Sequence, residues 1–106
     1  MPRYLYNASY TVEGTKGLIR DGGIKRRTAV EDAAKAIGAT VEAFYFVFGE
    51  SDVIAIVSAP DNVSATAVSL VVNASGAVRV RTSILLTPEE MDDATQKTPA
   101  YRPPGR

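Results

Sequence analysis

The sequence predicts an α+β domain in which four strands and two helices alternate as β-α-β-β-α-β, with a short helix after them. Apolar side chains repeat every second residue in some segments and at a spacing of three or four in others, as strands and helices require. Turn-forming residues separate these segments. The chain has 106 residues, which suits one domain that buries a core without disulfides or metals.

The first half is predicted to form one strand and one long helix. Residues 4–11 alternate aromatic or small side chains with polar ones, a pattern typical of a strand. Residues 15–20 are expected to form only a short helical turn before a pair of glycines. Residues 24–37 place apolar side chains at helical spacing, and Gly38 is the expected C-terminal stop.

Two further strands and a second helix follow. Residues 41–48 are rich in aromatic and β-branched side chains, and residues 53–57 are apolar throughout. The short turn between them predicts antiparallel neighbours. Asp61 is a suitable N-cap for a helix that runs to about Ser75, and Gly76 ends it.

The last part is predicted to form a strand, a capped helix and an arm. Residues 78–86 form the fourth strand, and Thr87-Pro88-Glu89-Glu90 begins a helix over 88–96 with a capping box. This element order is the ferredoxin-like motif, a four-stranded antiparallel sheet with both helices on one face. We expect one domain over residues 1–96 and an extended tail over residues 97–106.

Both faces of the predicted sheet are apolar. The third strand presents Val53, Ala55 and Val57 to one side and two isoleucines to the other, and the second strand is apolar on both sides as well. Since two helices cover one face, the other face needs a cover. We expect the same face of a second copy to provide it. The alternative is that the C-terminal helix and arm fold back over this face.

Several segments in this order resemble the GYD-domain family of small bacterial proteins, over nearly the whole chain. They are residues 13–14, 42–45, 49–52, 76–82 and 86–90. Gly49 and Asp52 match the motif that names the family, and Ser51 stands where the family has tyrosine. The resemblance implies a dimeric α+β barrel. It implies little about activity, because proteins that share this barrel include cofactor-independent monooxygenases, haem-handling enzymes, isomerases and binding proteins.

The composition excludes several kinds of chemistry. Histidine, cysteine and tryptophan are absent, which removes catalytic thiols, Ser-His-Asp triads, structural zinc sites and haem held by histidine. Twelve basic residues balance twelve acidic ones, which argues against nucleic acid or an anionic membrane as a partner. No apolar run has the length of a signal peptide core or a membrane span, so we expect a cytoplasmic protein without cofactor or metal.

Arginine and tyrosine side chains are the candidate ligand-binding groups. Arg79 and Arg81 share one side of the fourth strand and can clamp a carboxylate or phosphate; the alternative is a solvated or ion-paired edge. The tyrosines of the first strand can line a pocket or simply pack. Asn7 and Ser9 on the opposite side can orient a ligand or only satisfy each other. The candidate ligand-binding residues are Tyr6, Asn7, Tyr10, Tyr45, Arg79 and Arg81.

Two charged clusters can be interpreted either as binding sites or as ordinary surface and turn residues. Basic residues around the glycine pair can bind an anion or form a solvated face; they are Lys16, Arg20, Lys25, Arg26 and Arg27. Glu50 and Asp52 can act as a base or bind a cation, or serve only as turn residues.

Two functions are therefore open. The first is a homo-oligomer that binds an aromatic or carboxylate-bearing metabolite, or acts on it without a cofactor. The second is a non-catalytic oligomerisation or interaction module. A partly polar cavity within the fold would favour the first function, and a densely packed domain would favour the second.

Overall fold

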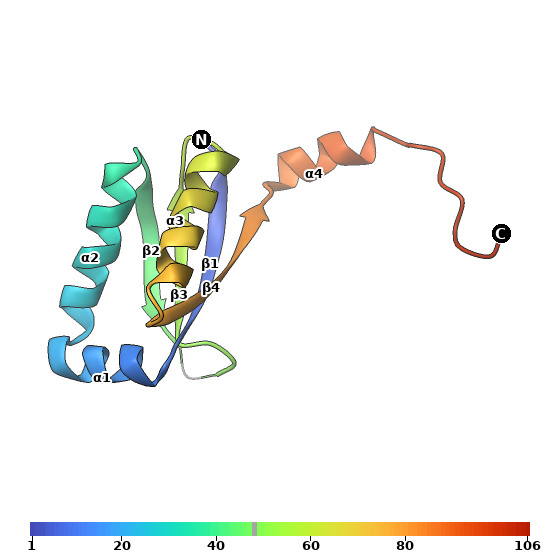
Figure 1. The fold of residues 1–106 in the computed structure, drawn as a ribbon. Coiled ribbons are helices and arrows are strands. Elements are labelled where there is room, and N and C mark those ends of the chain that lie inside the picture. Colours follow the sequence, from blue (N-terminus) through green and yellow to red (C-terminus); the bar gives the residue numbers. More distant parts are fainter. Residues whose placement is uncertain (48) are drawn as a thin grey trace.

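The computed structural model describes residues 1–47 and 49–106, and its fold is α+β as predicted (Figure 1). A four-stranded antiparallel sheet has the order β2-β3-β1-β4. Its strands are β1 (Arg3–Tyr10), β2 (Thr40–Phe46), β3 (Val53–Ser58) and β4 (Val78–Leu85). Phe48, the predicted end of the second strand, lies outside the described residues. The predicted antiparallel pairing of β2 with β3 is confirmed.

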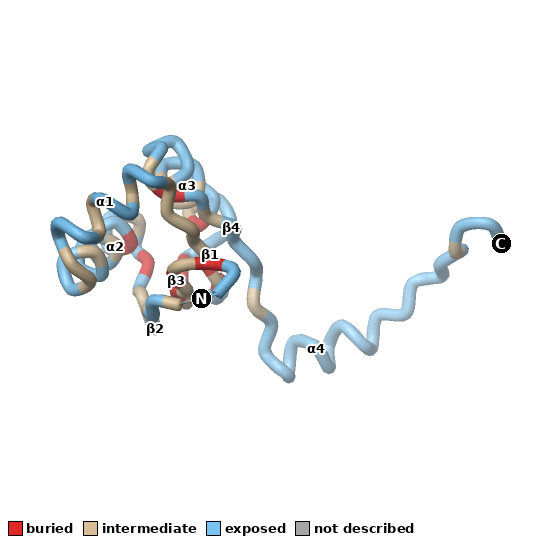
Figure 2. Tube along the Cα trace, turned by 90° about the horizontal axis from the view of Figure 1, so that it is seen from below, coloured by how far each residue is buried: buried red, intermediate tan, exposed pale blue. Residues whose placement is uncertain are grey.

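Helices α2 and α3 cover one face of the sheet, and α1 crosses its end (Figures 1 and 2). The helices are α1 (Val12–Asp21), α2 (Gly23–Ala36), α3 (Asn62–Ala74) and α4 (Pro88–Thr95). None of them, in the part of the chain that the structure describes, is long and apolar enough to cross a membrane.

Helix α1 is longer than the short turn predicted for residues 15–20. Thr11 caps it by accepting a hydrogen bond from the Gly14 backbone N–H. A Cβ on Gly14 would lie 1.9 Å from the Ala77 carbonyl oxygen, so glycine permits the close approach of α1 to the start of β4. Two glycines lower the helix propensity of this segment, and packing overrides that propensity.

The predicted helix ends are confirmed. The Asp61 side chain accepts a hydrogen bond from the Ser64 N–H at 2.8 Å and caps α3. Thr87 and Glu90 form the predicted capping box of α4. Gly76, which follows α3, has a φ of +77°, a left-handed conformation that favours glycine and turns the chain into β4.

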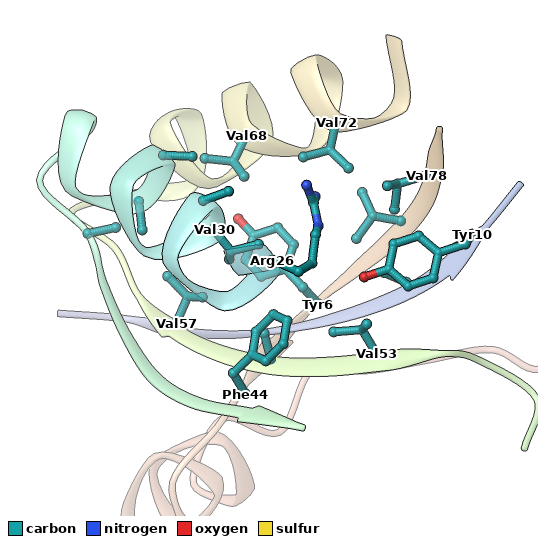
Figure 3. Close-up of a pocket in the computed structure, with 17 residues that line it drawn as sticks. Tyr6, Tyr10, Arg26, Val30, Phe44, Val53, Val57, Val68, Val72 and Val78 are labelled. Atoms are coloured by element: carbon teal, nitrogen blue, oxygen red, sulfur yellow. The ribbon is translucent and has the colours of Figure 1, made fainter. Parts of the chain in front are cut away.

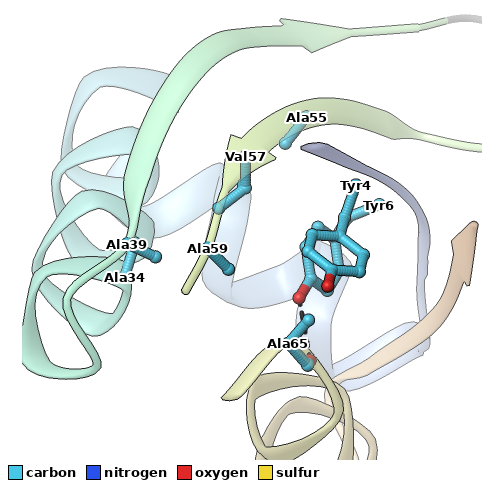
Figure 4. Close-up of a cluster of buried hydrophobic side chains, with 8 residues drawn as sticks. All are labelled: Tyr4, Tyr6, Ala34, Ala39, Ala55, Val57, Ala59 and Ala65. Carbon is cyan, nitrogen blue, oxygen red and sulfur yellow. Dashed lines mark hydrogen bonds between the residues drawn. The ribbon is translucent and has the colours of Figure 1, made fainter. Parts of the chain in front are cut away.

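The core lies between the sheet and the α2–α3 layer, and two tyrosines of β1 are central to it (Figure 4). The Tyr6 hydroxyl donates a hydrogen bond to the Ala65 carbonyl oxygen at 2.8 Å, and the Tyr4 hydroxyl donates to Asn62 Oδ1 at 2.5 Å. Both bonds tie β1 to α3. The packing interpretation of the first-strand tyrosines therefore holds for Tyr4 and Tyr6.

No described segment covers the opposite face of the sheet, and α4 and the tail project away from the body (Figures 1 and 2). The radius of gyration is 16.7 Å, against about 13 Å for a compact chain of about 100 residues. The C-terminal helix therefore does not fold back over this face in this structure, which corrects that alternative.

Candidate functional site

A cavity of about 230 Å³ lies between the sheet and helices α2 and α3 (Figure 3). Its walls are mainly valine and alanine, together with the ring of Phe44. The lining residues come from all four strands and from both helices. Because most of these side chains are small, they leave space between the two layers unfilled. Three polar side chains also line it: those of Tyr6, Tyr10 and Arg26.

Tyr10 and Arg26 point into this cavity from opposite layers, β1 and α2 (Figure 3). Burial raises the pKa of the Tyr10 hydroxyl above its ordinary value of 10.0, while the nearby Arg26 guanidinium lowers it and Asp52 raises it by smaller amounts. The hydroxyl therefore keeps its proton at neutral pH and serves as a hydrogen-bond donor.

Tyr6 lines the same cavity, but its hydroxyl is already used by the bond to Ala65. Burial raises the pKa of Tyr6, and the Ser69 side chain lowers it to a smaller extent. Tyr6 is thus a wall of the cavity and a structural link to α3, with its hydroxyl donated to the helix backbone.

The other four candidate residues lie on the open face of the sheet, the face that α2 and α3 leave uncovered. The strand register places Tyr45, Ile54, Asn7 and Arg81 in one row across all four strands. Arg79 lies opposite Ser9 in the same face. The structure therefore divides the six candidates, with two in the cavity and four on the open face.

A hollow at the β4 edge of the sheet brings Asn7, Arg79 and Arg81 together, with Ser9 beside them. Asn73 of α3 also lines it, since its side chain bonds the Val80 backbone at this edge. Both arginines are exposed, and neither forms an ion pair with any described residue. Asn7 Oδ1 is buried without a hydrogen-bond partner among the described residues. A buried amide oxygen without a partner is unfavourable, so Asn7 Oδ1 is an unused acceptor in this part of the face.

The acidic turn has a structural role through Asp52. Its carboxylate accepts a hydrogen bond from the Tyr10 backbone N–H at 2.8 Å, and its own N–H donates to the Ala8 carbonyl. Glu50 is exposed, and Ser51, which stands at the family tyrosine position, is 8% exposed. These bonds favour the turn interpretation of the carboxylate pair.

The cavity offers hydrogen-bond donors and apolar walls, and none of its described lining residues is a ready base. Its two tyrosines are held protonated, and its charged residue is an arginine. No group of three metal-ligating side chains occurs among the described residues. The arrangement is suited to hold a molecule, or to act on one that supplies its own reactive group.

Of the three polar side chains that line the cavity, Arg26 is the one that the candidate set missed. The sequence placed it in the basic cluster around the glycine pair. Arg26 lies four residues before Val30 and eight before Ala34, the buried residue of α2, so it follows the stripe that α2 turns toward the sheet. This spacing in the sequence indicates that Arg26 faces the sheet. The basic residues beside it favoured a solvated face instead.

A family model described as GYD domain matches residues 4–95. No curated protein and no solved structure matches the chain.

Proposed function

The chain belongs to the GYD-domain family, as its sequence segments predicted, and from this premise we propose that it is a homo-oligomeric small-molecule-binding protein or cofactor-independent enzyme. Its ligand is an aromatic or carboxylate-bearing metabolite. The observation that carries this proposal is the cavity of about 230 Å³ between the sheet and the helices. This volume lies just below the range of about 300–1,000 Å³ that is common for ligand sites.

The open sheet face supports a dimer. It exposes part of Leu5, Ile54 and Ile56, and 69% of Tyr45, with no described segment over them. Contact between two such faces would bury these side chains at about 25 cal/mol per Å². The strand order β2-β3-β1-β4, with α2 and α3 on one face, supports a ferredoxin-like subunit whose dimer is an α+β barrel.

A second candidate function is a non-catalytic oligomerisation module. The specific observation in its favour is that the described cavity residues include no ready base, while the apolar face alone can explain self-association. Ligand binding in the cavity distinguishes the two functions, because a module that only assembles gains nothing from an occupied cavity.

The test is a thermal-shift screen of small aromatic and carboxylate metabolites. A ligand at about a hundred times its Kd stabilises the folded state by about 2.7 kcal/mol, which raises the Tm by several degrees. Ala33→Phe places a ring at the cavity from an exposed position of α2 and should abolish the shift. Ala36→Phe, on the same helix but outside the cavity lining, should preserve it. Equal shifts in both variants, or no shift with any compound, would reject the cavity as a ligand site.

A further inference from the structure

Arg26 is the one charged side chain among the described residues that line the cavity. It is half-buried, whereas the other members of the basic cluster are exposed; these are Lys16, Arg20, Lys25 and Arg27. Helix α2 places it one turn before Val30, which also lines the cavity (Figure 3). This arginine therefore belongs to the cavity and not to the solvated face of the cluster.

The Arg26 guanidinium has no counter-ion within the described chain. The two ion pairs found there join Arg3 to Glu42 and Arg27 to Glu31. The carboxylate of Asp52 accepts the Tyr10 backbone N–H and forms no ion pair with Arg26. A half-buried cation among apolar walls is unfavourable unless an anion accompanies it. A negatively charged group bound in the cavity would therefore be stabilised by Arg26.

Tyr10 supplies a second donor beside this cation. Its ring comes from β1, and its hydroxyl points into the cavity that Arg26 enters from α2 (Figure 3). A planar guanidinium and a phenol hydroxyl together can satisfy the two oxygen atoms of a carboxylate. A phosphate dianion carries more charge and more acceptor oxygens than this pair of groups can satisfy.

We propose that the cavity binds a small apolar molecule with a single carboxylate, held at the carboxylate by Arg26 and Tyr10 and along its apolar part by the valine and alanine walls. This inference rests on the proposed function and names its ligand class. It also moves the anion-binding role from Arg79 and Arg81, which lie on the open face, to a residue inside the fold.

The experiment compares acids with neutral amides of the same shape by isothermal titration calorimetry. The probes are 3-phenylpropionate with 3-phenylpropanamide, and octanoate with octanamide. The wild-type protein should bind at least one acid about tenfold or more tightly than its amide, because a charge-assisted hydrogen bond is stronger than a neutral one. Arg26→Gln should remove this preference and leave the amide affinity within about twofold.

Matched variants separate charge from position and from folding. Lys25→Gln makes the same charge change on α2 at an exposed residue outside the cavity lining and should keep the preference. Arg26→Lys keeps the charge without the planar fork and should keep part of it. Tyr10→Phe should weaken the acid several-fold and the amide less, because the bond from the hydroxyl to a carboxylate is stronger than that to a neutral amide oxygen.

Two outcomes would overturn the inference while preserving the proposed function. One is equal binding of acid and amide to the wild-type protein. The other is an acid preference that Arg26→Gln leaves intact. If neither pair of probes binds, the inference is rejected, and the metabolite screen with Ala33→Phe decides separately whether the cavity binds any ligand.

Discussion

At the scale of single residues, Asp52 connects three strand ends. Its carboxylate accepts the Tyr10 N–H, its N–H donates to the Ala8 carbonyl, and its carbonyl accepts the Val47 N–H at 2.9 Å. Asp52 thus continues the β1–β3 pairing into the turn. The same bonds hold the end of β1 from which the Tyr10 ring enters the cavity.

Asp52→Ala should lower the free energy of unfolding by about 1–3 kcal/mol, because it leaves the part-buried Tyr10 N–H without an acceptor. Urea unfolding followed by circular dichroism measures this loss. Glu50→Ala, a neighbouring exposed carboxylate, is the control and should leave stability nearly unchanged. A similar loss in both variants would show that the acidic turn acts through its charge and not through these bonds.

At the scale of elements, the approach of α1 to the start of β4 depends on Gly14. The Thr11 N–H donates to the Ala77 carbonyl at 3.0 Å, and the Thr11 hydroxyl donates to the Gly76 carbonyl at 2.9 Å. Gly14 lies against the same carbonyl of Ala77. These contacts attach α1 to the sheet and stabilise a helix whose intrinsic helix propensity is low.

Gly14→Ala should destabilise the protein by about 1–3 kcal/mol or more, because the added methyl group meets backbone and not a flexible side chain. Gly17→Ala in the same helix meets only the end of Arg20, at 3.8 Å, and should stabilise the protein by about 0.5–1 kcal/mol through helix propensity. Denaturant midpoints of the two variants test this. If Gly14→Ala is as stable as the wild type, α1 does not pack closely against the Ala77 backbone.

The cap of α3 makes stability depend on pH in the acid range. Hydrogen bonds from Ser64 lower the pKa of Asp61 below its ordinary value of 3.8. A carboxylate with a lowered folded-state pKa stabilises the fold above its unfolded pKa, and this contribution is lost as the pH falls through the folded value. Glu42 titrates in the same direction, since the Arg3 side chain lowers its pKa below 4.5.

Asp61→Asn should retain the Tm at neutral pH, because asparagine caps a helix as well as aspartate does. The variant cannot titrate, so its Tm should fall less than that of the wild type between about pH 6 and about pH 3. Glu42 is present in both proteins and contributes equally. Thermal melts across this range measure the difference, and parallel curves would exclude a titrating cap.

At the scale of the whole molecule, the open face is the surface on which the proposed dimer depends. Ile56 lies near its centre, opposite Leu5 on β1 and Ala43 on β2. The row that contains Asn7 and Arg81 lies beside it. A partner placed over this face would cover the isoleucines and the unpartnered Asn7 oxygen together.

Ile56→Lys should convert the proposed dimer to a monomer, because a charge facing the apolar surface of a partner is strongly unfavourable. Light scattering at about micromolar protein measures the mass. Ile19→Lys, at a position of α1 that is 80% exposed, is the matched control and should leave the dimer intact. A monomeric wild-type protein would reject the dimer directly.

Much of the candidate site could not be predicted because charge and burial conflict along one helix. A run of basic residues indicates a solvated face, and this holds for Lys25 and Arg27. Arg26 follows the spacing of Val30 instead and enters the cavity. Strand alternation correctly predicted which residues share a face of the sheet. Tyr6 and Tyr10 lie on one face, and Asn7 lies on the other.

The sequence by itself determined the elements of this protein other than α1, because strand alternation, helix spacing, the caps at Asp61 and Thr87 and the glycine stop at Gly76 act over a few residues. Only the tertiary structure decided which face of the sheet receives the helices, since β3 is apolar on both sides and its pattern is the same from either side. That choice places Tyr10 and Arg26 around a cavity and leaves Asn7 and Arg81 on the open face, because contacts between distant segments select one of two locally equivalent arrangements.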